Sequence, residues 1–333
     1  MKIVIISDHL EYQKKTPSIK WVYNILSHSS HTVKYISTGL SLSRLAFRRI
    51  GLRDFFFNCF SSNSPIKFAF PIYPILNRFT KWYFIRFWSS HYIRIISKFQ
   101  PDIILVESGI PSIILYSIFH KDSLKNIRKV YRISDVTGSF RYNPVLKEID
   151  NFILHNRREY NCLVSAPTTY KNIFPDQILR PGVPLYALNQ SKALKEKLIV
   201  YVGVYPLPYK FVDEISRAYP EYKVICTCEG KSHWSNVEFI GIIEQIDIER
   251  IIRKASIGIM FFPSGVSDWF LASSNKLALY NAFRIPVISN NCGVNLRKYC
   301  IYNIREGFGQ DQDCKTQEVY SWEQYVDNLI NLC

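Results

Sequence analysis

The sequence predicts an α/β protein made of two doubly wound units, and three observations support this prediction. The chain has 333 residues, which is more than one ordinary domain and about right for two. Short apolar runs alternate with longer mixed segments in both halves, as strands and helices do around a parallel sheet. A Pro-, Gly- and charge-containing tract interrupts this pattern, so we expect an interdomain linker at residues 184–197.

The first unit is expected over residues 1–185. Its strand candidates are short runs rich in Ile, Val and Leu, which suits strands that are buried on both faces. These strands are expected at residues 2–7, 32–37, 102–107, 129–134 and 162–166. The helices are expected in the longer segments between them, at residues 18–26, 79–99, 112–119 and 143–156.

The second unit is expected over residues 198–316, where the pattern restarts. Strands are expected within residues 197–205, 221–229, 237–243, 257–262 and 285–290. Helices are expected within residues 208–220, 246–256 and 273–283. A last, amphipathic helix is expected within residues 317–333, because positions 322, 325, 326, 329 and 330 are apolar at helical spacing.

Two such units leave a cleft between the carboxyl ends of two sheets, which is where open α/β sheets bind ligands. We therefore expect the GT-B architecture, in which two Rossmann-like doubly wound domains face each other across a cleft. In this architecture we expect the second unit to bind the nucleotide-linked sugar that is donated and the first unit to bind the molecule that accepts it.

Positive charge is concentrated in one part of the first unit. The net charge is +15, and between residues 34 and 100 eleven Lys and Arg stand against a single acid, Asp54. Residues 44–99 also hold many Trp, Tyr and Phe, a composition typical of the headgroup zone of an anionic membrane. Nucleic acid is a rival partner for basic and aromatic residues. We exclude it because no nucleic-acid-binding motif is found, which leaves a buried aromatic core with a solvated basic rim as the other alternative.

The location is expected to be cytoplasmic, peripheral on the inner face of a bacterial plasma membrane. The first apolar run is too short for a signal peptide, and no uncharged run approaches the ~20 residues that span a bilayer. The eight cysteines include one C-x-C pair and no C-x-x-C, and no His completes a zinc site, so we expect reduced thiols and no metal.

The stretch "SSNKLALY" suggests an anion site. If Ser273 or Ser274 caps a helix, the free N–H groups and the helix dipole attract negative charge, and Lys276 adds a full positive charge. Together they suit a diphosphate that is held without a metal or other cofactor. The alternative is a plain N-cap beside a solvated lysine.

A candidate general base lies in the first unit. Asp135 follows the strand in "YRISD", at the carboxyl edge of the sheet, where a carboxylate can take the proton of an acceptor hydroxyl. The alternative is that Asp135 caps the following turn. The segment from residue 236 to residue 289 resembles the region of GT-B glycosyltransferases whose helix meets the nucleotide diphosphate. Retaining enzymes of that kind usually carry a glutamate four residues after the lysine, where this chain has Tyr280, so the resemblance implies an inverting enzyme.

At this point the sequence resembles the GumK-like β-glucuronosyltransferases of bacterial exopolysaccharide synthesis. The resemblance lies in "YISTGLSLSRL", "YRISD" and "SDWFLASSNKLALY", in this order along most of the chain. It implies inverting transfer of a sugar, glucuronic acid in that family, from UDP to a lipid-linked glycan. It further implies that Asp135 is the catalytic base and that Ser274 and Lys276 contact UDP.

Weaker candidates complete the expected sites. On the donor side these are Gly203, at the end of a strand, Glu244, placed to reach the ribose, and Tyr280. On the acceptor side they are Asp8, His9, Glu107 and Arg132, at or near the ends of first-unit strands. The alternative for Gly203 is simple strand-to-helix packing. For the other weaker candidates it is a solvated or structural role. For the whole chain, the alternative functions are a nucleotide-sugar 2-epimerase on the same fold and a catalytically silent GT-B-like scaffold.

Overall fold

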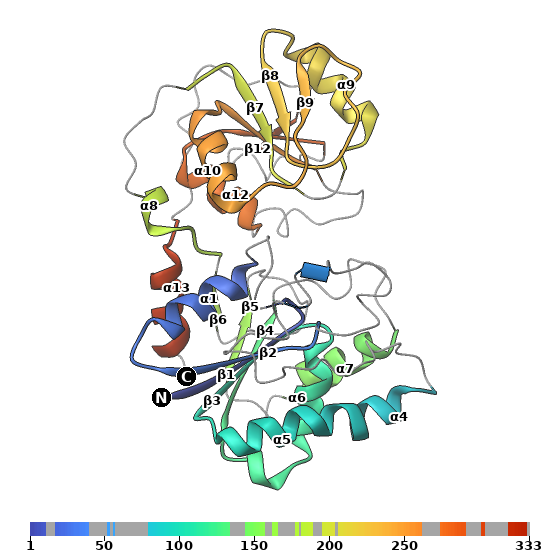
Figure 1. Ribbon diagram of the computed structural model, residues 1–333, viewed down its shortest axis with the longest axis vertical. Coiled ribbons are helices and arrows are strands. Elements are labelled where there is room, and N and C mark those ends of the chain that lie inside the picture. The colour runs from blue at the N-terminus through green and yellow to red at the C-terminus, as the bar shows by residue number, and fades with distance from the viewer. Residues whose placement is uncertain are drawn as a thin grey trace. The chain divides into compact units, whose positions relative to one another are not determined.

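The chain folds into two compact units, residues 1–180 with 325–333 and residues 181–324. The computed structural model describes residues 1–10, 17–39, 52–53, 56, 79–133, 144–156, 162–165, 177–179, 181–188, 195–203, 206–261, 274–290, 301–303 and 319–331. Figure 1 traces the chain through both units. Among these described residues, no helix is both long and apolar enough to cross a membrane.

The first unit is built on a parallel sheet of six strands in the order β2-β1-β3-β4-β5-β6. The strands are β1 (Lys2–Ser7), β2 (Thr32–Ser37), β3 (Ile103–Glu107), β4 (Arg128–Ile133), β5 (Cys162–Ser165) and β6 (Gln177–Ile178). The five predicted strands are confirmed, and β6 is an addition. The chain runs from β1 to β2 on one side and then to β3 on the other, so the topological switch point lies between β1 and β3.

Helices cover both faces of this sheet (Figure 1). They are α1 (Ser18–Ser27), α4 (Lys81–Tyr83), the π-helical turn η1 (Phe84–Trp88), α5 (Ser89–Phe99), α6 (Pro111–Phe119), the 3₁₀ turn η2 (Asp122–Leu124) and α7 (Pro144–His155). Helices α5, α6 and α7 pack on the face that presents Val4, Ile104 and Tyr131. The helix predicted at residues 79–99 is confirmed from Lys81 to Phe99, with a π-helical turn in its middle.

The second unit contains a second parallel sheet, in the order β12-β11-β10-β7-β8-β9. Its strands are β7 (Leu198–Tyr201), β8 (Lys223–Cys226), β9 (Val237–Phe239), β10 (Ile257–Met260), β11 (Val287–Ser289) and β12 (Ile301–Asn303). Its helices are α8 (Leu185–Leu188), α9 (Tyr209–Ala218), α10 (Gln245–Lys254) and α12 (Asn275–Ala282). One core lies under α9 and the other under α10 and α12. The switch point of this sheet lies between β7 and β10.

The chain passes between the units at residue 180 rather than within the predicted linker. Gly182 packs so closely on the backbone of Trp322 that an added Cβ would lie 2.8 Å from it, and Val183 bridges to Ser321. These contacts tie residues 181–183 to the second unit. Helix α13 (Trp322–Asn331) begins in the second unit and continues in the first from Tyr325. Its predicted apolar face is confirmed, since Trp322, Tyr325, Val326 and Leu329 are buried.

Candidate functional site

The N-terminus of α12 follows β10, beside the switch point of the second sheet. Ser274 has extended backbone, and its hydroxyl oxygen accepts the N–H groups of Lys276 and Leu277 at 3.2 and 3.3 Å. Ser274 is therefore the N-cap of α12. A hydroxyl that accepts two such bonds still has its own proton to donate to a ligand.

Lys276 extends from the first turn of α12 to the other face of the sheet. Its ammonium nitrogen lies 5.0 Å from the centroid of the Tyr201 ring, and Tyr201 belongs to the core under α9. Burial lowers the pKa of Lys276 to about 8, and the nearby Cys228 thiol opposes this shift. No ion pair joins Lys276 to another residue in the described part of the chain. This lysine thus reaches over the carboxyl edge of β7 as a partly desolvated cation.

Tyr280 lies one helical turn after Lys276 and is fully buried. Its hydroxyl accepts the N–H of Val202 and directs its proton toward the carbonyl oxygens of Val200 and Ile259, each contact being 3.2 Å long. The ring packs on Gly258, where an added Cβ would come within 2.9 Å of it. The structure gives Tyr280 a packing role rather than the donor contact predicted for it, because its side chain has no exposed surface.

Gly203 and Glu244 lie on the same edge of the second sheet. An added Cβ on Gly203 would lie 2.4 Å from the Tyr201 hydroxyl, and the Gly203 N–H donates to Thr227 Oγ1 at 3.0 Å. The space at Gly203 is therefore filled by Tyr201, which favours the packing alternative. Glu244 is exposed and precedes α10, where its carbonyl accepts the N–H groups of Asp247 and Ile248.

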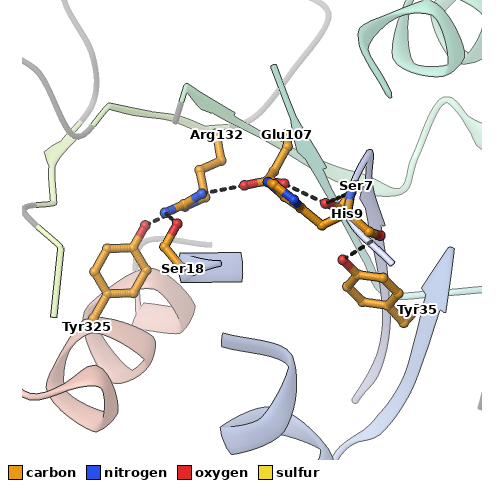
Figure 2. A network of polar contacts seen from close by, with 7 residues as sticks. All are labelled: Ser7, His9, Ser18, Tyr35, Glu107, Arg132 and Tyr325. Atoms are coloured by element: carbon orange, nitrogen blue, oxygen red, sulfur yellow. Dashed lines mark hydrogen bonds and ion pairs between the residues drawn. The ribbon is translucent and has the colours of Figure 1, made fainter. Parts of the chain in front are cut away.

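In the first unit, Glu107 and Arg132 bind each other (Figure 2). Arg132 Nη1 donates to Glu107 Oε1 at 2.6 Å, and both side chains are at most 4% exposed. Arg132 also donates to Ser18 Oγ of α1 and to Tyr325 Oη of α13, at 2.8 Å each. This buried network joins two strands to two helices, so it does not present Glu107 and Arg132 to an acceptor as predicted.

Asp8 and His9 lie at the end of β1, next to the switch point of the first sheet. Ser7 Oγ donates to Glu107 Oε2 at 2.6 Å and accepts the N–H of His9 at 3.1 Å, while the carbonyl of His9 accepts the Tyr35 hydroxyl (Figure 2). The backbone of His9 is thus fixed on both sides and its side chain is exposed. Asp8 accepts from Thr38 and is partly exposed. Both side chains can meet a substrate.

Two predicted residues, Asp135 and Ser273, lie outside the described residues, as does most of the basic aromatic segment. In its described part, Phe84, Trp88 and Tyr92 are core residues. Phe79, Trp82, Tyr83 and Phe87 are exposed. The described part of the segment is thus partly core and partly surface.

Sequence reasoning missed Tyr201 and Cys228, which lie around the Lys276 ammonium. Tyr201 looked like one more apolar residue of a buried strand. Its position as the last residue of β7 at the switch point is the signal that could have found it.

No known protein family matches this chain, and no curated protein does. Several solved structures, however, are similar to it. Sucrose-phosphate synthase from Thermosynechococcus elongatus is 11% identical, with a TM-score of 0.63 over 99% of this chain and 98% of that one. UDP-GlcNAc 2-epimerase from Neisseria meningitidis, bound to UDP-GlcNAc, is 11% identical, with a TM-score of 0.58 over 100% and 99%.

An α-glucosyltransferase in complex with UDP and a 13-mer DNA that contains an HMU base is also similar. It is 11% identical, with a TM-score of 0.53 over 100% of this chain and 90% of that one. The predicted exclusion of nucleic acid is therefore wrong, because a protein of this fold is solved on DNA, also in a second complex with an A:G mismatch. Together these likenesses show that the chain has the GT-B fold, with two Rossmann-like units.

Proposed function

We propose that this protein is a glycosyltransferase that uses a UDP-sugar as its donor. The observation that carries the proposal is the position of Lys276, a partly desolvated ammonium group at the N-terminus of α12 and the carboxyl edge of β7. The likeness to solved structures bound to UDP or UDP-GlcNAc supports the nucleotide class.

Electrostatics explain why an anion suits this position. A helix N-terminus carries about half a positive charge, so a cation there is unfavourable unless an anion joins it. Lys276 is also partly removed from water, which makes its charge still less favourable. A diphosphate that accepts from the Lys276 ammonium and the Ser274 hydroxyl relieves both effects.

The same contacts serve the chemistry of transfer. As the bond between the sugar and UDP breaks, negative charge grows on the diphosphate, where Lys276 and the end of α12 stabilise it. Transfer with inversion of configuration at C1 of the sugar requires a base on the side opposite the departing UDP. Asp135 remains our prediction for that base. Asp8 and His9, which are at least partly exposed at the end of β1, are the described candidates for acceptor contacts.

The finer features of the activity rest on the sequence. Glucuronic acid as the sugar and a lipid-linked glycan as the acceptor are predictions from the resemblance. Independence of metal ions is likewise a prediction from the sequence, and activity in EDTA tests it. A cytoplasmic location on the inner face of the plasma membrane is also a prediction, and fractionation of cells tests it.

Isothermal titration calorimetry with UDP, UDP-glucuronic acid, UDP-glucose, UDP-GlcNAc, GDP-mannose and ADP tests the donor class. We expect saturable binding of the uridine nucleotides in EDTA and weak or no binding of GDP-mannose and ADP. Equal affinity for all nucleotides, or no binding, would contradict the proposal. Lipid-linked glycans and DNA are then compared as acceptors, because DNA is no longer excluded.

A 2-epimerase is the second candidate, and the bound UDP-GlcNAc in a similar structure is the reason to test it. An epimerase inverts C2 of a UDP-sugar without any acceptor and releases little UDP. A transferase releases UDP and forms a glycosylated product. Nuclear magnetic resonance of UDP-GlcNAc incubated with the protein alone separates the two.

A further inference from the structure

We propose that Tyr280 is a positioning residue that holds Lys276 above the Tyr201 ring, so that the diphosphate of the donor meets a preformed cation. This inference rests on the proposed function and assigns a role to a residue that touches neither the nucleotide nor the acceptor.

The hydroxyl group of Tyr280 is the first reason. Phenylalanine would fill the same space in the core, yet this chain buries a polar hydroxyl, which is unfavourable unless it is hydrogen-bonded. Among the described residues, its hydrogen-bond partners are backbone groups at the switch point: Val200 and Val202 at the end of β7 and Ile259 in β10. One side chain thus joins α12 to the two strands between which the order of the sheet reverses.

The position of Tyr280 relative to Lys276 is the second reason. Residues four apart lie on the same face of a helix, and long helical side chains lean toward the N-terminus. The Tyr280 ring therefore lies below the turn that carries Lys276. Fixing this ring against the sheet holds in place the turn of α12 from which Lys276 extends.

The Tyr201 ring is the third reason. Tyr201 lies between Val200 and Val202, the two β7 residues that the Tyr280 hydroxyl contacts. Tyr280 therefore holds both sides of the contact between Lys276 and Tyr201, the helix on one side and the strand end on the other. The space for its ring comes from Gly258, where a Cβ would collide with it at 2.9 Å.

A double-mutant cycle on UDP affinity tests this coupling. The four proteins are the wild type, Tyr280→Phe, Lys276→Ala and the double variant, titrated with UDP in EDTA below all their melting temperatures. We expect Tyr280→Phe to weaken UDP binding about threefold to tenfold, the effect of one hydrogen bond. In the Lys276→Ala background the same change has no effect, because the group that it positions is gone.

Two further variants separate positioning from general destabilisation. Gly258→Ala displaces the Tyr280 ring while Lys276 and Tyr201 keep their own side chains. We therefore expect it, too, to weaken UDP binding only when Lys276 is present. It also keeps the proposal testable if Tyr280→Phe fails to fold. Tyr222→Phe is the matched control, because Tyr222 precedes β8 at the opposite, amino edge of the sheet, and we expect wild-type affinity.

The outcomes are distinct. If Tyr280→Phe leaves the UDP affinity unchanged, or weakens it equally with and without Lys276, the inference is overturned while the proposed function stands. If the wild type binds no UDP, the proposed function is overturned and the inference with it. A loss that depends on Lys276 supports both.

Discussion

The buried carboxyl group of Asp150 gives the clearest prediction for stability, through the change Asp150→Asn. Asp150 lies in α7 with no exposed surface, and its Oδ1 accepts the Tyr131 hydroxyl at 2.6 Å. Its Oδ2 has no hydrogen-bond partner among the described residues. Burial raises the pKa of Asp150 from 3.8 to about 7, although the hydrogen bond from the Tyr131 hydroxyl opposes the shift.

The sign of the effect follows from linkage. Because the pKa is higher in the folded state than in the unfolded state, folding binds a proton, and the stability from the protonated acid is lost as the pH rises toward and through 7. For these two pKa values, the free energy of unfolding falls by about 2 to 3 kcal/mol from pH 5 to pH 8. An asparagine cannot ionise and still accepts the Tyr131 hydroxyl.

Urea denaturation of the wild type and Asp150→Asn at pH 5, 6, 7 and 8 measures this difference. The stability of the variant relative to the wild type should rise by about 2 to 3 kcal/mol from pH 5 to pH 8, since all other groups cancel. Asp327→Asn, a change of an exposed acid in α13, is the control and should follow the wild type. Parallel pH profiles for Asp150→Asn and the wild type would refute the reasoning.

Three other predictions follow from the contacts described above. UDP affinity should fall as the pH rises from 7 to 9, because the pKa of Lys276 is about 8 and the diphosphate prefers the ammonium form; Lys276→Arg should flatten this profile in calorimetry. Arg132→Met should destabilise the protein by about 3 to 5 kcal/mol by leaving Glu107 buried and unpaired, and adding Glu107→Gln should restore part of that loss in urea denaturation. Gly203→Ala should displace the Tyr201 ring, since the new Cβ would lie 2.4 Å from its hydroxyl, and weaken UDP binding in the same titration; unchanged affinity would show that the ring position does not matter.

Much of the fold could be predicted because parallel strands that are buried on both faces leave a clear pattern. β1 and β3 are runs of Ile, Val and Leu between polar segments, and both lie where expected. β6 and β12, of two and three residues, lie in segments where no strand was predicted, so they were missed. The place where the chain changes units depends on Gly182 packing against Trp322, 140 positions away, and no local pattern shows such a contact.

The candidate site was only partly predictable for a related reason. The sequence places Glu107 and Arg132 in neighbouring strands, but only the register of β3 and β4 shows that they lie opposite each other and pair. Tyr280 was correctly placed one turn after Lys276, yet nothing local shows that its hydroxyl reaches the β7 and β10 backbones. Helix spacing shows which residues share a face, and sheet order decides what that face meets.

The central claim is that Lys276 and the N-terminus of α12 bind the diphosphate of a UDP-sugar. Its most direct test is a calorimetric titration of UDP into the wild type and Lys276→Ala at pH 7 in EDTA. We predict saturable binding to the wild type that is weakened about tenfold or more in the variant, as for the loss of a charge-assisted contact. Equal affinities in the two proteins, or no binding to the wild type, would contradict the account.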